Sequence, residues 1–321
     1  GDVNNDGLID LITTDMAPED HYRSKTNMRS MNTESFYKIV DAGAHYQYMA
    51  NALQINTGEG SFSDVANMAG ISNTDWSWAS LLVDLDNDGL KDIIISNGSK
   101  KDVENSDYLN ILNNLDHKDI SAEELFQLSK KTPSQPLANY IFKNTGALKF
   151  ENVSKDWGFD TPSFSNGMAY GDLDNDGDLD LVTNNIDAPA FIYENKATGN
   201  FLKIKLEGSE KNKFGYGAKV VIHHNGKLQV AENNVTRGFI SSVENGVFFG
   251  LGKDIEVDKV EVTWRDGKSN TFKNVDANTT LVASYKKSSS VVQKREEPKT
   301  LLTQVTASIM GLDFVHKENE Y

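Results

Sequence analysis

Residues 84–92 read Asp84-Leu-Asp-Asn-Asp-Gly-Leu-Lys-Asp92, and they lead directly into the apolar run Ile93-Ile-Ile95. The same nine-residue pattern occurs as Asp2-Val-Asn-Asn-Asp-Gly-Leu-Ile-Asp10 and as Asp172-Leu-Asp-Asn-Asp-Gly-Asp-Leu-Asp180. Oxygen-bearing side chains alternate around one glycine in each copy, which predicts a loop wrapped around a hard cation. Because each copy runs into a β-type apolar segment, the pattern predicts a repeated unit of loop and strand.

We predict up to three structural Ca²⁺ ions, one per loop, because Ca²⁺ takes about six to eight oxygen ligands and the loops offer no His or Cys. Positions 1, 3, 5 and 9 supply side-chain oxygens, and position 7 supplies its backbone carbonyl. The predicted ligands are Asp2, Asn4, Asp6, Leu8, Asp10, Asp84, Asp86, Asp88, Leu90, Asp92, Asp172, Asp174, Asp176, Asp178 and Asp180. Ordinary Asp/Asn/Gly turns are the alternative, but four carboxylates at alternate positions repel one another without a cation.

An EF-hand is a second alternative, because its loop also begins with acidic residues at alternate positions before a glycine. That motif needs a bidentate Glu at position 12 and a helix on either side. Position 12 is occupied here by Thr13, Ile95 and Thr183, and the flanking residues are strand-like. The sequence therefore disfavours an EF-hand.

A longer repeat surrounds the second and third loops. Residues 53–98 and 141–186 align without a gap at an offset of 88 residues, and a partial further copy begins at Phe191. Within the copy at 141–186 we expect four short strands, at 140–144, 149–153, 166–171 and 181–184. Four short strands per repeat are typical of a β-propeller blade. Residues 1–198 are therefore predicted to form propeller blades, with insertions at 16–50, which look irregular, and at 99–137, which look helical.

The pattern changes after Asn200. Apolar and polar residues alternate in 201–206, 218–223 and 257–264, and Asn225-Gly226 and Asp266-Gly267 stand where hairpin turns belong. Residues 199–285 are therefore predicted to form an antiparallel β domain, followed by a charged linker at 286–300. The fold class is all-β, with short helical insertions. Residues 301–321 are expected to begin a further repeat module, and we expect the chain to be a fragment in which the propeller is incomplete.

These features resemble known families. The acidic loops with strand-like flanks resemble FG-GAP/VCBS repeats. The second domain resembles the ASPIC/UnbV module in Phe214-Gly-Tyr-Gly217, Arg237-Gly-Phe-Ile-Ser-Ser242, Phe248-Phe-Gly-Leu-Gly252 and Val260-Glu-Val-Thr-Trp264. The combination is similar to exported VCBS-repeat proteins of the Bacteroidetes. The resemblance implies an extracellular or outer-membrane surface location, Ca²⁺-stabilised blades, and a role in adhesion, scaffolding, or binding of a glycan or protein ligand.

The amino-acid composition limits which classes of binding partner and which cellular compartment are expected for this chain. The formal charge of −15 argues against nucleic acid or an anionic membrane surface, because binding to phosphates needs a basic face. The chain has no cysteine, so it has no disulfide framework and no thiolate metal site. No apolar run approaches the roughly 20 residues of a membrane-spanning helix. These features are compatible with an exported protein in which metal ions replace disulfides.

No catalytic constellation stands out, and we predict a non-catalytic protein. His223-His224 lies in a strand pattern, where alternation sends one ring inward and the other outward. Asp75-Trp-Ser-Trp78 is a candidate for stacking a sugar, although a Trp at this place in a propeller is more often packed between blades. The alternative function is a carbohydrate-active enzyme, such as a polysaccharide lyase, built on a calcium-containing propeller.

Overall fold

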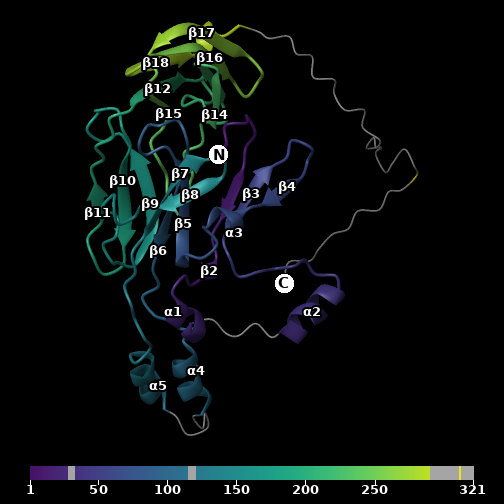
Figure 1. The fold of residues 1–321 in the computed structure, drawn as a ribbon, viewed down its shortest axis with the longest axis vertical. Coiled ribbons are helices and arrows are strands. Elements are labelled where there is room, and N and C mark those ends of the chain that lie inside the picture. The colour runs from purple at the N-terminus through teal and green to yellow at the C-terminus, as the bar shows by residue number, and fades with distance from the viewer. Residues whose placement is uncertain (28–32, 115–120, 290–310, 312–321) are drawn as a thin grey trace. The chain divides into compact units, whose positions relative to one another are not determined.

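The fold is taken from a computed structural model, which describes residues 1–27, 33–114, 121–289 and 311. Residues 1–289 belong to one compact unit. The predicted further module and most of the predicted linker lie outside the described residues. Residues 1–289 are built mainly from strands, with a few short helices (Figure 1). The all-β prediction is confirmed.

Three antiparallel sheets follow one another along residues 1–198, as expected for an incomplete set of propeller blades. The first has the order β1-β3-β4, from β1 (Leu11–Thr13), β3 (Ala52–Asn56) and β4 (Phe62–Asp64). The second has the order β2-β5-β6-β7-β8, from β2 (Met16–Ala17), β5 (Asp75–Val83), β6 (Asp92–Asn97), β7 (Tyr140–Gly146) and β8 (Lys149–Asn152). The third has the order β11-β10-β9, from β9 (Ser165–Gly171), β10 (Asp180–Asn185) and β11 (Phe191–Tyr193).

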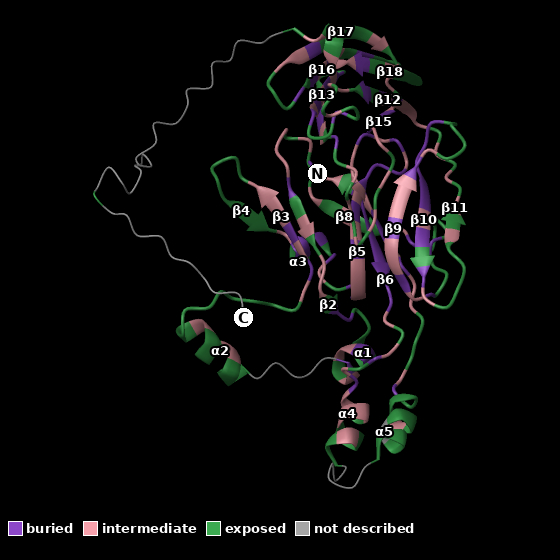
Figure 2. Cartoon of the chain, turned by 180° about the vertical axis from the view of Figure 1, so that it is seen from behind, coloured by how far each residue is buried: buried purple, intermediate pink, exposed green. Residues whose placement is uncertain are grey.

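Strand β6 lies at the centre of the blades, and both of its faces are buried (Figure 2). Ile93 and Ile95 pack into the core shared with the first sheet, beside Leu53 and Phe142. Ile94 points to the opposite face and packs into the core shared with the third sheet. Since strand side chains alternate between faces, a strand between two cores needs a continuous apolar run. The run after the second loop therefore reflects packing on both faces.

The sequence repeat and the structural blades are out of phase. The copy at 141–186 contains the four expected strands, but β7 and β8 belong to the second sheet while β9 and β10 belong to the third. The second and third acidic loops each connect two neighbouring antiparallel strands of one sheet, β5 to β6 and β9 to β10, and the first loop leads into β1. A sequence repeat has no intrinsic starting point, so the alignment alone could not place the blade boundaries, which lie between β4 and β5 and between β8 and β9.

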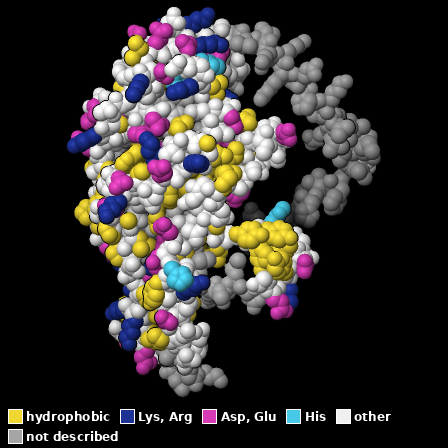
Figure 3. All heavy atoms as spheres, in the orientation of Figure 1, with side chains coloured by type: hydrophobic (Ala, Val, Ile, Leu, Met, Phe, Trp, Pro, Cys, Tyr) yellow, Lys and Arg dark blue, Asp and Glu magenta, His cyan; other side chains and the backbone are white. Residues whose placement is uncertain are grey.

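The insertions contain four of the helices. Residues 16–50 were expected to be irregular, but they hold β2, α1 (His21–Thr26) and α2 (Thr33–Asp41). The helical expectation for 99–137 is confirmed by α4 (Ser106–Asn113) and α5 (Ala122–Ser129), with the capping box formed by Ser121 and Glu124. A further helix, α3 (Ala66–Ala69), follows β4. Hydrophobic side chains gather on the surface of α2 and the segment after it (Figure 3). They include an aromatic cluster in which Phe36 contacts Tyr37, Tyr46 and Tyr48.

The second domain is a sandwich of two sheets around one apolar core. One sheet has the order β15-β12-β18, from β12 (Asn200–Glu207), β15 (Val247–Gly252) and β18 (Thr279–Ser284). The other has the order β14-β13-β16-β17, from β13 (Lys219–His224), β14 (Lys227–Glu232), β16 (Glu256–Thr263) and β17 (Ser269–Asp276), and a 3₁₀ turn (Tyr285–Lys287) follows β18. The pairing is antiparallel as expected, except that β12 and β18 run parallel. Asn225 and Gly226 both have positive φ, as a two-residue hairpin turn requires.

Candidate metal centres in the acidic loops

The three loops share one backbone conformation. The Asn at position 4 and the Gly at position 6 have positive φ in every loop, with values of 57°, 57° and 64° for Asn5, Asn87 and Asn175. These turns fold the loop back over its first carboxylate. In the second loop, Asp84 accepts hydrogen bonds from the backbone N–H of Asp88 at 3.1 Å and of Gly89 at 2.8 Å. Asp2 accepts the matching bonds in the first loop. The first Asp therefore holds each of these loops closed.

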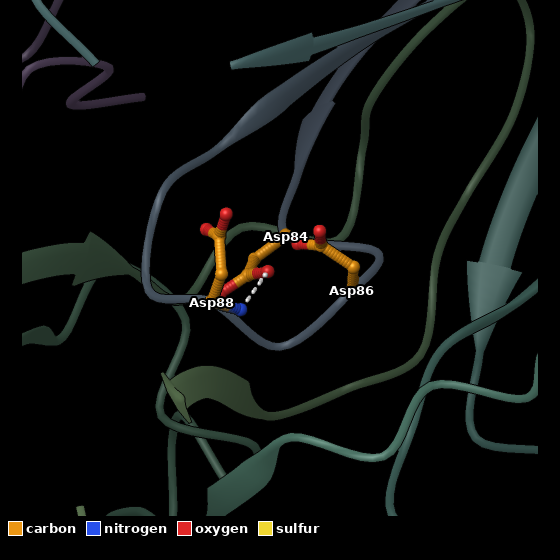
Figure 4. A group of neighbouring side chains, drawn as sticks. All are labelled: Asp84, Asp86 and Asp88. Carbon is orange, nitrogen blue, oxygen red and sulfur yellow. Dashed lines mark hydrogen bonds between the residues drawn. The ribbon is translucent and has the colours of Figure 1, made fainter. Parts of the chain in front are cut away.

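The carboxylates at positions 1, 3 and 5 converge inside the loop. Asp84, Asp86 and Asp88 each place a carboxylate oxygen within 4.8 Å of the others (Figure 4). The third loop does the same with its carboxylates, Asp172, Asp174 and Asp176. In the first loop, the Asn4 amide donates to Asp6 at 2.9 Å, so of the three repulsive pairs among positions 1, 3 and 5 only that of Asp2 and Asp6 remains. Three convergent oxygens on a wrapped backbone form the start of a Ca²⁺ coordination shell.

The carboxylate at position 9 has a structural role in all three loops. Asp92 accepts a hydrogen bond from the backbone N–H of Leu85 at 3.0 Å and another from that of Asn144 at 2.9 Å. Asp10 and Asp180 make the same pair of bonds. Position 9 therefore ties its own loop to a neighbouring strand. A carboxylate can accept about four hydrogen bonds, so two accepted bonds leave lone pairs free for a metal ion. The metal-ligand role of the position-9 residues therefore stays a prediction.

The electrostatics of the loops favour a bound cation. Burial, followed by repulsion from Asp92 and Asp88, raises the pKa of Asp84 well above its usual value. Burial also raises the pKa of Asp92 to about 7 and that of Asp178 to about 6. A cation would lower these pKa values by compensating the charge. In addition, one buried oxygen of Asp86 has no hydrogen-bond partner among the described residues, as expected for a metal ligand. The residues thus fit calcium.

Known proteins match both parts of the chain. Residues 2–95 match the FG-GAP-like repeat family, and residues 208–290 match the ASPIC and UnbV family. This chain contains both domains. It is 26% identical over 291 residues to cartilage acidic protein 1 of Homo sapiens, covering 76% of this chain and 42% of that protein. The same protein of Xenopus tropicalis is 25% identical over 263 residues, covering 68% of this chain and 38% of that protein. The chain thus spans about two fifths of these relatives.

The FG-GAP-like loops are linked to one another by asparagines that the sequence analysis did not single out. Asn5 donates to the Gly89 carbonyl of the next loop at 2.9 Å, and Asn87 donates to the Gly177 carbonyl at 3.1 Å. In the opposite direction, Asn144 donates to the Val3 carbonyl at 2.8 Å. Asn195 donates to the Leu85 carbonyl at 2.7 Å. The first two loops therefore each donate to the next loop, and an asparagine outside the loops, in or just after an outer strand of the next blade, donates back to the earlier loop.

Two lysines neutralise part of the loop charge. Lys143 of β7 pairs with Asp86 and lies 3.3 Å from Asp88. Lys203 of β12 lies 3.3 Å from Asp172 and 2.7 Å from Glu244. The aligned repeat has Ile55 at the position of Lys143. This replacement of an apolar residue by a lysine is the feature of the sequence that could have indicated a role for Lys143 at the loop.

The ASPIC/UnbV domain packs directly on the second loop through β15. The Gly252 N–H donates to the Asn87 carbonyl at 2.7 Å. A Cβ on Gly250 would lie 2.1 Å from an Asp84 carboxylate oxygen and 2.6 Å from the Asn87 backbone. The motif that identifies this domain therefore needs glycine where the loop approaches.

The other residues considered from sequence have structural partners. Asp75 forms two hydrogen bonds with the buried Arg23 of α1, at 2.6 and 2.8 Å, a partner that the sequence analysis missed. The Trp78 indole donates to the Gly98 carbonyl at 2.7 Å and packs on Phe239. These contacts support the alternative in which Trp78 packs inside the propeller, as opposed to stacking a sugar.

The histidine pair behaves as the strand pattern predicted. His224 is buried, and its two ring nitrogens lie 2.8 Å from Asp254 and 3.1 Å from Gln229. His223 is partly exposed beside Glu261. Both nitrogens of His224 are engaged, so this ring is held as part of the structure.

Proposed function

We propose that this chain is the calcium-binding part of a non-catalytic extracellular repeat protein that acts in adhesion, scaffolding or ligand binding. The observation that carries the proposal is the set of three equivalent loops, two of which gather three carboxylates each around one point. Such a concentration of carboxylates destabilises the folded state, and a bound cation would relieve the repulsion. Positions 1, 3 and 5 and the position-7 carbonyl would hold the ion, which would supply positive charge and fixed geometry.

The structural role of calcium is supported by the connections between loops. Reciprocal asparagine bonds join the loops of neighbouring blades, and β15 of the second domain lies against the second loop. An ion that orders one loop therefore also orders the contacts between blades and domains. The family match and the similarity to cartilage acidic protein 1 support the extracellular setting.

The ligand of the proposed binding function is a glycan or a protein. Exposed aromatic rings near α2, including Tyr37, Tyr46 and Tyr48, offer the kind of surface that contacts either class. In the part of the chain that the structure describes, no helix is long and apolar enough to cross a membrane.

Thermal unfolding in calcium and in EDTA tests the calcium proposal. An ion that binds only the folded state at about 100 times its Kd adds about 2.7 kcal/mol per site. We expect a clear rise in Tm with calcium and no rise with magnesium at equal concentration. Calorimetric titration should give up to three equivalents of bound calcium. Identical melting curves in calcium and EDTA would overturn the proposal.

A further inference from the structure

A cavity of about 220 Å³ lies where the blades meet the ASPIC/UnbV domain. The residue at position 8 of every acidic loop lines it, namely Ile9, Lys91 and Leu179. The first and third loops thus present apolar side chains to the cavity, and only the second presents a charge. The loop conformation is the same in all three, so the loop itself does not require this lysine.

A second cation reaches the cavity from the segment between β14 and β15. Gly238, with φ of +68°, packs against Ala79 and Leu81 of β5, and Phe239 packs on Trp78. This tight docking holds Arg237 at the cavity wall. The arginine belongs to the motif that resembles the ASPIC/UnbV module, and calcium binding assigns it no role.

Neither cation has a carboxylate partner within the described ranges. The Arg237 Nε is buried without a hydrogen-bond partner, and Nη2 donates to the Glu232 backbone carbonyl at 3.1 Å. The Lys91 ammonium lies 3.5 Å from the Val230 carbonyl. Lys91 and Arg237 are both partly buried, and withdrawing a positive group from water without an anion is costly, because the group loses part of its hydration.

The acidic side chains at the cavity have other partners. Glu244 forms an ion pair with Lys203 at 2.7 Å. Asp84 accepts two backbone N–H groups of its own loop and belongs to the proposed calcium site. Glu232 is exposed and contributes its backbone carbonyl to Arg237. The Gly1 amino group also lines the cavity, but it donates to the Asp10 carbonyl at 3.1 Å. Lys91 and Arg237 are therefore the two side-chain cations of the lining without a carboxylate partner among the described residues.

We propose that this cavity binds a small oxyanion, a carboxylate, sulfate or phosphate group, between Lys91 and Arg237. A guanidinium and an ammonium that line the same cavity can both provide charge-assisted hydrogen bonds to such a group. The volume corresponds to roughly seven water molecules, which suits a small anion or the charged end of a larger ligand. The site takes Lys91 from the second acidic loop but uses none of the predicted calcium ligands, so it holds even if the proposed calcium function fails.

Titration of the folded chain with sodium acetate, sodium sulfate and sodium methyl phosphate tests the site, with sodium chloride keeping the ionic strength constant. Trp78 packs on Phe239, two residues from Arg237, so tryptophan fluorescence and calorimetry can both report binding. We expect saturable binding of at least one anion, and the strongest of the three identifies the preferred group.

Two variants and one matched control separate a specific site from general charge effects. Lys91→Leu introduces the residue found at this position in the third loop, so it should fold normally, and Arg237→Gln removes the second charge. Each variant should lower the affinity for the anion by about tenfold or more, which is the effect of losing one charge-assisted hydrogen bond. Arg265→Gln removes the same charge from an exposed turn and should bind like the wild type. The inference fails if the wild type shows no saturable binding, or if all three variants bind the anion equally.

Discussion

Replacing Asn144 by Ala tests whether the loops are held together by the asparagine bonds. The Asn144 side chain is buried and makes three hydrogen bonds: to the Val3 carbonyl at 2.8 Å, to the Lys91 carbonyl at 3.1 Å, and from the Gly146 N–H at 3.0 Å. The Val3 bond joins the first loop to the second blade. A net contribution of about 1 kcal/mol per bond gives an expected loss of about 3 kcal/mol.

Asn56 provides the matched control, because it occupies the same position in the aligned repeat. Its side chain donates to the Ile9 carbonyl at 3.3 Å and accepts from the Gly58 N–H at 3.0 Å. No bond to a second loop is present among the described residues. Asn56→Ala should therefore cost only about 1–2 kcal/mol. Asn195→Ala, which breaks the bond to the Leu85 carbonyl, should resemble Asn144→Ala.

Urea unfolding in saturating calcium, followed by tryptophan fluorescence, measures the free energy of unfolding for each variant. We expect Asn144→Ala and Asn195→Ala to lose clearly more stability than Asn56→Ala, with unchanged m-values. Equal losses in all three variants would show that the bonds between loops contribute nothing beyond the local turn, and the reasoning would be refuted.

Three further predictions concern the loops. Lowering the pH from 8 to 6 should weaken calcium binding, measured by calorimetry, because burial in the metal-free fold raises the pKa of Asp92 to about 7 and calcium must then displace a proton. For the same reason, ionisation of Asp92 should make the metal-free protein less stable as the pH rises from about 4 through 7. A calcium affinity that does not change with pH would contradict the assignment of Asp92 as a ligand. Lys143→Met should strengthen calcium binding at the second loop by about tenfold and lower stability in EDTA, since the ammonium that pairs with Asp86 and Asp88 is removed; weaker binding would show that Lys143 supports the site. Gly250→Ala should cost about 1–3 kcal/mol and remove one equivalent of bound calcium, whereas Gly171→Ala, whose Cβ would come no closer than 3.4 Å to Glu244, should do neither.

Local sequence patterns predicted the strands and loops because their causes are local. The alternation of carboxylates around Gly89 and the continuous run Ile93-Ile-Ile95 reflect a turn and a strand with two buried faces. The hairpin at Asn225-Gly226 follows from the positive φ of both residues. Each of these features is determined within about ten residues, so a single sequence reveals it.

The contacts that the sequence did not reveal join residues that lie far apart along the chain. Asn144 and Val3 are 141 residues apart, and Arg23 and Asp75 are 52 apart. Asparagine, arginine and lysine have many possible partners, and their type alone does not select one. The parallel pairing of β12 with β18 was missed for the same reason, since alternation predicts a strand but not its neighbour.

The position-9 carboxylate explains why the loops act as a joint between blades. Asp92 closes the second loop through Leu85 and at the same time holds the backbone of Asn144. The side chain of Asn144 then holds Val3 of the first loop. Because one rigid chain of hydrogen bonds runs from loop to loop, an ion that orders one loop lowers the conformational entropy left for its neighbour to lose. With calcium bound as proposed, the loops would stabilise the arrangement of the blades as a connected group. The proposed ligand binding would then fall to other surfaces, including the cavity lined by Lys91 and Arg237.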